Sequence, residues 1–169
     1  AKSEGVRDEI GVLALHTGYA NRFFPGTSVQ QTRLRYALLV PWQIESLLAQ
    51  RPNLRAGQDV VVIGAGGVGL NAIQGARIAG ARRIVAVDMS EEKLAVARDF
   101  GATDGVLATD ETPWRAAKEA MGRGADAVFV TVGAIPAFDT APKYLAYGGK
   151  VVMVGMPASG AASSYEPAM

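Results

Sequence analysis

The sequence predicts an α/β fold with a doubly wound, mostly parallel sheet. From about Arg55 to Gly155, short runs of apolar β-branched residues alternate with helix-like stretches, and the first run leads into a glycine-rich loop. Glycine is also common, with 20 in 169 residues. Such alternation is typical of parallel strands joined by right-handed helical crossovers. Sheets of this kind bind ligands at the carboxyl ends of their strands.

Five strands and four helices are predicted in order along this region. The strands are short apolar runs, as expected for strands buried on both faces, and cover residues 59–63, 83–87, 105–107, 125–132 and 150–154. The helices carry apolar residues at helical spacing and end near glycines, and cover residues 68–79, 91–100, 113–121 and 136–146. Ser90 is a good N-cap for the second helix, and Pro113 suits the first turn of the third.

The chain is expected to have three parts. Residues 1–54 form a poorly patterned N-terminal segment, helical over about 29–50, where Pro41 kinks or ends the helix. Residues 55–157 form the α/β domain. Residues 158–169 are small and polar and are predicted to form a C-terminal loop.

Composition excludes several classes of function. A net charge of +1 provides no attraction to nucleic acid or to an anionic membrane, and no apolar run is long enough to span a bilayer. The absence of cysteine excludes disulfides, thiolate metal sites and a cysteine nucleophile, and the single histidine, His16, excludes an all-histidine zinc site. The N-terminus lacks a secretory signal pattern, so a cytoplasmic protein is expected.

The first predicted strand leads into Gly64-Ala65-Gly66-Gly67-Val68-Gly69, a G-x-G-x-x-G pattern. Gly64 permits a tight turn, Gly66 lets a pyrophosphate approach the backbone, and Gly69 lets the helix pack closely on the sheet. The free N–H groups and the positive dipole end of the following helix would face the phosphates. The pattern therefore predicts dinucleotide binding, and the alternative is a glycine-rich turn in another kind of α/β protein.

Asp88 follows the second predicted strand, 19 residues past Gly69. The acid that accepts the adenosine-ribose hydroxyls is expected about 20 residues beyond the motif. A carboxylate there would repel the 2′-phosphate of NADP, and the next residues, Met89 and Ser90, include no arginine. NAD is therefore predicted over NADP, unless Asp88 is merely an exposed loop acid.

Four segments, VVVIGAGGVGLNAIQGARIAGA, IVAVDMSEEKLAVARDFGATD, GRGADAVFVTVG and GGKVVMVGMP, together resemble the cofactor domain of zinc-dependent medium-chain alcohol dehydrogenases. The resemblance runs from about Arg55 to Pro157 and implies a Rossmann NAD-binding fold. It implies that the pyrophosphate is lined by Gly66, Gly67 and Val68, with Val68 also behind the nicotinamide. It further implies that Asp88 and Lys93 bind the adenosine ribose, and that the nicotinamide is contacted by Val132, Val154 and Met156.

The sequence also departs from this family. The family's catalytic zinc is held by a cysteine, a histidine in Gly-His-Glu and a further cysteine or acid, whereas His16 lies in Leu-His-Thr. Zinc is therefore expected only in a catalytic domain absent from this chain, and no catalytic or metal-binding residue is predicted here. Thr17-Gly18-Tyr19 is similar to a turn at the start of the family's cofactor domain, yet Thr17 lies 51 residues before Val68, about twice the family's interval. Residues 21–50 are thus an insertion, a divergent segment or foreign sequence.

The resemblance implies an NAD-dependent oxidoreductase that acts on a small alcohol or aldehyde. In the whole protein zinc would polarise the substrate oxygen while hydride passes to or from the nicotinamide. This chain alone is expected to bind NAD without turnover. The alternatives are a free-standing NAD(H)-binding module or sensor and, more remotely, an S-adenosylmethionine methyltransferase, although the acid expected late in the first strand is Val62 here. The resemblance also implies a sixth strand. The apolar edge at residues 150–154 predicts pairing with another chain, as in a homo-oligomer, or coverage by residues of the N-terminal segment.

Overall fold

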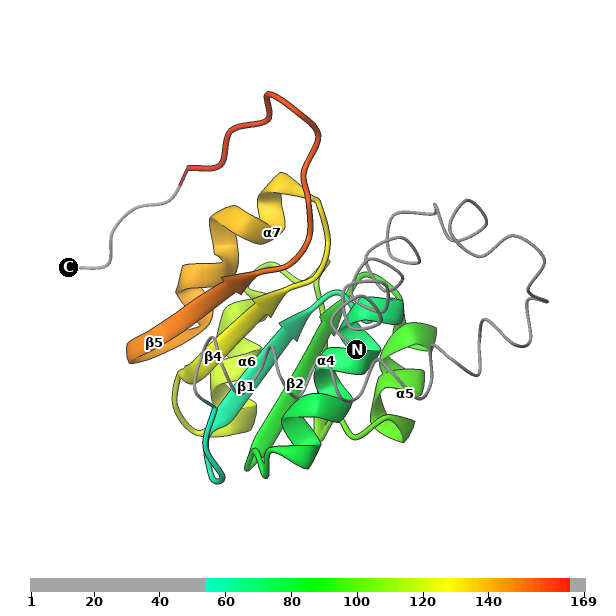
Figure 1. The fold of residues 1–169 in the computed structure, drawn as a ribbon, viewed down its shortest axis with the longest axis vertical. Coiled ribbons are helices and arrows are strands. Elements are labelled where there is room, and N and C mark those ends of the chain that lie inside the picture. The colour runs from blue at the N-terminus through cyan, green and yellow to red at the C-terminus, as the bar shows by residue number, and fades with distance from the viewer. Residues whose placement is uncertain (1–53, 165–169) are drawn as a thin grey trace, which may run out of the picture. The chain divides into compact units, whose positions relative to one another are not determined.

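A computed structural model describes residues 54–164 of the chain. They form one sheet of five parallel strands in the order β3-β2-β1-β4-β5 (Figure 1). The strands are β1 (Asp59–Ile63), β2 (Arg83–Asp88), β3 (Asp104–Leu107), β4 (Ala125–Val130) and β5 (Leu145–Met153). The predicted parallel α/β fold is confirmed.

The helices that connect the strands begin and end where the sequence provides the signals. They are α4 (Gly67–Ile78), α5 (Glu91–Asp99), α6 (Pro113–Met121) and α7 (Ile135–Thr140), followed by a short 3₁₀ helix, η1 (Ala141–Tyr144). The Ser90 hydroxyl accepts a hydrogen bond from the Lys93 N–H at the start of α5. Gly122 ends α6 in the left-handed conformation, with φ +74°.

The sheet is buried on both faces, which gives three layers. One face of the central strands packs Val60, Ile84 and Phe129 with residues of α4 and α5, such as Ile73 and Leu94. The other face packs against α6, α7 and η1, through residues that include Val61, Val85, Val128, Met121 and Phe138. Helices therefore cover both faces, as Figure 1 shows. This double burial explains why the strands are continuous apolar runs rather than alternating ones.

The order of the strands places a crevice at the end of β1. From β1 the chain proceeds outward through β2 to β3. Helix α6 then connects β3 back to β4, which lies on the other side of β1. The strand order therefore reverses between β1 and β4, and the connections from these two strands lead to opposite sides. The two strands pair in parallel, from Val60 opposite Ala127 to Ile63 opposite Val130. Such switch points form the ligand crevice of open parallel sheets.

The prediction of a helix over 136–146 and a strand over 150–154 is wrong in its boundaries. Helix α7 ends at Thr140, and Pro142 in η1 has no N–H to continue the α-helical ladder. β5 begins at Leu145, so Gly148 and Gly149 lie inside the strand instead of closing a helix. Its pairing with β4 shifts register between Ala125 and Ala127, and Gly148 has φ +75°. A glycine at an irregularity in a strand is a common arrangement. The strand predicted over 125–132 also ends earlier, at Val130.

Several expectations fall on residues outside the described range. These are the helix over 29–50, the placement of His16 and of Thr17-Gly18-Tyr19, and the sixth strand, which would follow Met169. β5 is an edge strand within residues 54–164, and the pairing of that edge with another chain stays a prediction. No helix within this range is long and apolar enough to cross a membrane.

Candidate functional site

The glycine loop makes the turn from β1 into α4, and two of its glycines are required by close packing. Gly64 has φ +100°, and its N–H donates to the Val87 carbonyl at 2.7 Å. A Cβ at Gly64 would collide with the Val132 side chain, and a Cβ at Gly69 would collide with the Gly64 carbonyl oxygen. The first and last glycines therefore allow the helix to start directly against the end of the strand.

The N-terminus of α4 is bare. The N-cap is Gly66, which has no side chain to satisfy the helix, and the first turn contains no acidic residue. The Leu70 N–H donates to the Gly66 carbonyl at 2.8 Å, so the N–H groups of Gly67, Val68 and Gly69 come before the intrahelical ladder. A Cβ at Gly66 or Gly67 would meet no atom within 4 Å. An uncapped helix start, the positive dipole end and open space are the features by which helix N-termini bind phosphate groups.

The contrast with α5 supports this reading of the α4 terminus. At α5 the Ser90 side chain caps the backbone, and Glu91 and Glu92 lie in the first turn. The positive end of α5 is thus met by the protein's own oxygens. Of these two helix termini, the start of α4 is the one whose donors are met by no side-chain cap and no acidic residue of the first turn.

Asp88 lies beside the loop at the carboxyl end of β2. Its side chain is only 9% exposed, and its Oδ2 accepts the Ala65 N–H at 2.8 Å. Oδ1 accepts the Ser90 N–H at 3.0 Å and lies 3.9 Å from the Lys93 Nζ. Each carboxylate oxygen has two lone pairs, so acceptor capacity remains for a sugar hydroxyl. The sequence placed Asp88 near the motif, but it did not predict that the carboxylate also holds the loop.

A threonine that sequence reasoning missed reaches the loop from the other side. Thr131 follows β4, and its Oγ1 lies 2.9 Å from the Gly64 carbonyl oxygen and 3.0 Å from that of Ile63. Its neighbour Val132 is half-buried beside Gly64. The signal in the sequence is a hydroxyl residue directly after a buried strand, one position before Val132.

The chain after β5 approaches the chain after β4. The Val154 and Gly155 N–H groups both donate to the Val130 carbonyl, at 2.9 and 2.8 Å. A Cβ at Gly133 would collide with the Met156 carbonyl oxygen. Val154 is 39% exposed and Met156 80% exposed. Both side chains are therefore accessible at the same edge of the sheet as the glycine loop.

The structure brings the predicted site residues to one edge. Nine of them lie in the glycine loop or at the carboxyl ends of strands: Gly64, Gly66, Gly67, Val68, Gly69, Asp88, Val132, Val154 and Met156. Lys93 instead lies in the first turn of α5, where its ammonium approaches Asp88. Their contacts with a cofactor stay a prediction.

The zinc implied by the resemblance does not fit the residues described. Residues 54–164 contain no group of three or more histidine, cysteine, aspartate or glutamate side chains that could hold a metal ion. The sequence has no cysteine anywhere, and His16 precedes the described range. Residues 54–164 therefore offer no ligand set for zinc.

Known relatives match most of the α/β region. An NDMA-dependent alcohol dehydrogenase from Amycolatopsis methanolica is 38% identical over 106 residues, covering 62% of this chain and 29% of that protein. An L-threonine 3-dehydrogenase from Deinococcus deserti is 37% identical over 103 residues, covering 60% of this chain and 30% of that protein. This chain therefore spans about a third of the length of the curated relatives it matches.

A solved structure has the same fold. The benzyl alcohol dehydrogenase of Acinetobacter calcoaceticus superposes with a TM-score of 0.69 at 27% identity, covering 75% of this chain and 35% of that one. Residues 1–64 match a family of unknown function. Residues 67–169, more than half of the chain, match the family model described as zinc-binding dehydrogenase. The chain therefore belongs to the zinc-binding dehydrogenase family.

Proposed function

We propose that this chain binds a nicotinamide adenine dinucleotide at the glycine loop, as the cofactor-positioning part of an oxidoreductase. The observation that carries this proposal is the bare start of α4, where Gly66 provides no side-chain cap and a Cβ at Gly66 or Gly67 would meet no atom within 4 Å. The site lies at the switch point between β1 and β4, with Asp88 one strand away. A diphosphate at the helix start and a ribose at Asp88 would use both features.

We further propose that the cofactor is NAD. The Asp88 carboxylate is nearly buried, so a 2′-phosphate placed against it would face a charge that water screens poorly. Lys93 is the neighbouring cation, but its Nζ lies 3.9 Å from Asp88 Oδ1 and its side chain is 58% exposed. That ammonium is therefore directed to the acid rather than to a second phosphate. Weaker binding of NADPH than of NADH supports this choice, and equal binding contradicts it.

The reaction of the whole protein is proposed from its relatives. Those named above are alcohol and threonine dehydrogenases, and a bound nicotinamide supplies a hydride acceptor or donor for oxidation of an alcohol or reduction of an aldehyde. The residues of this chain would hold the diphosphate through backbone N–H groups and the ribose through Asp88. Val132, Val154 and Met156 would border the nicotinamide and fix which way it faces.

The direct test removes the open space without disturbing the fold. In Gly66→Ala, a methyl group would occupy the position of a phosphate oxygen, and we expect the affinity for NADH to fall about tenfold or more, roughly 1.4 kcal/mol. Because the added Cβ meets no protein atom within 4 Å, the free energy of unfolding should change by no more than about 1 kcal/mol. Fluorescence titration and urea unfolding of the full chain measure the two quantities.

The control variant should lower the stability and leave the NADH affinity unchanged, the opposite of Gly66→Ala. Gly122 has φ +74° at the end of α6, so Gly122→Ala should cost about 1 kcal/mol of stability. It should leave NADH affinity unchanged, because α6 begins after β3 and ends at the opposite edge of the sheet from the glycine loop. NADH affinity in Gly66→Ala equal to that of the wild type would refute the proposed site.

A further inference from the structure

Thr131 is placed where three backbone segments meet. It follows β4 directly, and its own N–H donates to the Ile63 carbonyl at 2.9 Å, which extends the pairing with β1 by one residue. Its Oγ1 reaches the carbonyl oxygens of Ile63 at 3.0 Å and Gly64 at 2.9 Å. One hydroxyl carries a single hydrogen, so it is shared between two carbonyls at the point where β1 becomes the loop.

The same hydroxyl lies close to the first and last glycines of the motif. A Cβ added at Gly64 would lie 2.7 Å from Oγ1, and one added at Gly69 would lie 3.1 Å from it. The space that these glycines leave is thus partly occupied by the threonine. The loop is consequently contacted from both sides: by the Asp88 carboxylate on Ala65, and by the Thr131 hydroxyl on Gly64.

We propose that Thr131 is a positioning residue that holds the glycine loop in the geometry that binds the dinucleotide. It acts through Gly64 and Gly69 and does not itself touch the cofactor. This inference rests on the proposed function of the loop, but the role of the hydroxyl in holding the loop can be measured without any ligand.

Valine is the informative replacement because it has the shape of threonine without the hydrogen bond. A methyl carbon in place of Oγ1 would lie about 3 Å from two carbonyl oxygens, closer than the 3.3–3.6 Å of even a weak C–H···O contact. The Gly64 carbonyl would lose its donor and the loop would shift. Serine keeps the hydroxyl and should restore the contact.

The experiment compares Thr131→Val and Thr131→Ser in the full chain by NADH titration and by amide hydrogen exchange. We expect Thr131→Val to bind NADH about tenfold more weakly and Thr131→Ser to remain within about twofold of wild type. Without ligand, the Gly64 and Ala65 amides, bonded to Val87 and Asp88, should exchange at least about tenfold faster in Thr131→Val. The Arg82 amide, bonded to Gln58 at the far end of the sheet, is the internal reference.

The matched control is Thr140→Val, which removes another threonine hydroxyl bonded to a carbonyl, that of Pro136 at 2.7 Å in α7. It should change neither NADH affinity nor exchange at the loop. Unchanged amide exchange at the loop in Thr131→Val would overturn the proposal. Loop amides that exchange as fast in Thr131→Ser as in Thr131→Val would overturn it too. If Thr131→Val does not fold, Thr131→Ala against Thr131→Ser decides by the same exchange criterion. If the wild type does not bind NADH, the proposed function fails, while loop exchange still judges the role of Thr131.

Discussion

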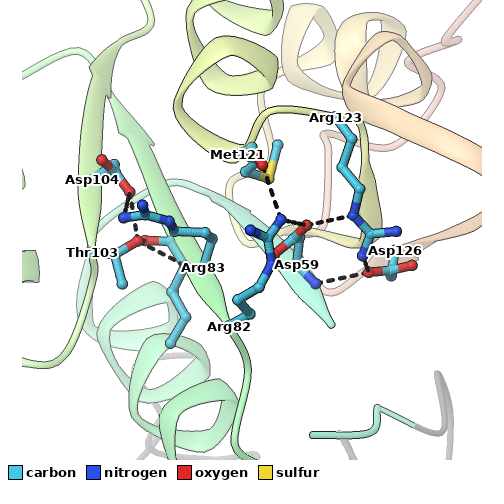
Figure 2. Close-up of polar contacts among 9 residues, drawn as sticks. Asp59, Arg82, Arg83, Thr103, Asp104, Met121, Arg123 and Asp126 are labelled. Atoms are coloured by element: carbon cyan, nitrogen blue, oxygen red, sulfur yellow. Dashed lines mark hydrogen bonds and ion pairs between the residues drawn. The ribbon is translucent and has the colours of Figure 1, made fainter. Parts of the chain in front are cut away.

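The two edges of the same sheet are built on opposite principles. At the carboxyl edge, α4 begins without a side-chain cap, and the side chains of Asp88 and Thr131 hydrogen-bond to the loop that leads into it. At the amino edge, charged side chains bond to each other and to the backbone (Figure 2). Asp59, the first residue of β1, is at the centre of that arrangement.

Asp59 ties together three segments at the amino edge. Its Oδ2 accepts from Arg82 Nη2 at 2.6 Å and from Arg123 Nε at 2.7 Å, and its side chain is fully buried. Arg82 also donates to the Met121 carbonyl at 2.9 Å, and Asp126 accepts the Asp59 N–H at 2.8 Å. The hydrogen bond to Asp59 raises the pKa of Arg123, which keeps that guanidinium charged. The amino edge thus pairs charged side chains with one another, whereas the carboxyl edge leaves the start of α4 without a side-chain cap.

The largest expected effect tests the packing between strand and helix at the carboxyl edge. In Gly69→Ala the new methyl group collides with the Gly64 carbonyl oxygen, so strand and helix must separate. We expect a loss of about 3 kcal/mol in the free energy of unfolding, at the upper end of overpacking effects. Urea unfolding measures it, together with the loss of NADH binding that a displaced loop would cause.

Gly67→Ala is the matched control two residues earlier. Its Cβ would meet no atom within 4 Å and its backbone is helical, so stability should stay within about 1 kcal/mol of wild type or rise, because alanine favours the helix. NADH affinity should nevertheless fall, since the methyl group enters the phosphate space. Equal destabilisation by both variants would show that the loop has no open side, and the contrast between the edges would fail.

A smaller effect on stability is expected from a substitution at the amino edge. Asp59→Asn keeps the shape of the side chain but removes the charge that both arginines share, and should cost about 2 kcal/mol, typical of hydrogen bonds to charged groups. Because the residue lies at the other edge from the loop, NADH affinity should be unchanged. Urea unfolding and NADH titration of the same variant test the separation of the two edges.

Asp104→Asn serves as its control. Asp104 also faces an arginine, but Arg83 Nη1 lies 3.6 Å from Asp104 Oδ2, and the two side chains are 45% and 29% exposed. Such an exposed ion pair contributes little to stability, so the free energy of unfolding should change by no more than about 0.5 kcal/mol. Similar losses in the two variants would mean that pairing, and not burial, makes Asp59 important.

Much of this fold could be predicted because its signals are local. Residues 59–63 form a strand as predicted, since five consecutive apolar or buried positions suit a strand covered on both faces. Ser90 caps α5 as predicted, since the cap needs only the next three residues. The glycine loop and Asp88 follow from a spacing that the sequence displays directly. In contrast, the end of α7 was misplaced because pairing with β4 decides where the irregular strand β5 begins.

The contacts that the sequence did not predict join residues far apart in the chain. Thr131 bonds to Gly64 across 67 positions, and Arg123 bonds to Asp59 across 64. No local pattern marks either residue, because a threonine after a strand and an arginine in a turn are both ordinary. Their partners are defined only when parallel pairing of β4 with β1 brings the two strand ends together. Register, and not residue type, creates both contacts.

The smallest effect at neutral pH concerns Tyr144 of η1, which leads into the amino end of β5. Its side chain is 1% exposed, and burial raises the pKa of its hydroxyl from 10 to about 12. The folded state therefore resists loss of that proton more than the unfolded state does. The stability that the neutral hydroxyl provides is complete below pH 10 and is lost as the pH rises from 10 through about 12. Tyr144→Phe should consequently unfold at nearly the same urea concentration at pH 7 but lose less stability as the pH rises from 10 toward 12.

Tyr147→Phe is the comparison that isolates burial. Tyr147 lies three residues further along the chain, in β5, and is fully exposed, so removing its hydroxyl should change the free energy of unfolding little at any of these pH values. Unfolding curves at pH 7, 9 and 11 for both variants separate the two tyrosines. If Tyr147→Phe protects against alkaline unfolding as much as Tyr144→Phe does, the closed packing at the amino edge around η1 is not the source of the pH dependence. If only Tyr144→Phe protects, the edge without the glycine loop excludes water at an ionisable group, as its buried Asp59 also implies.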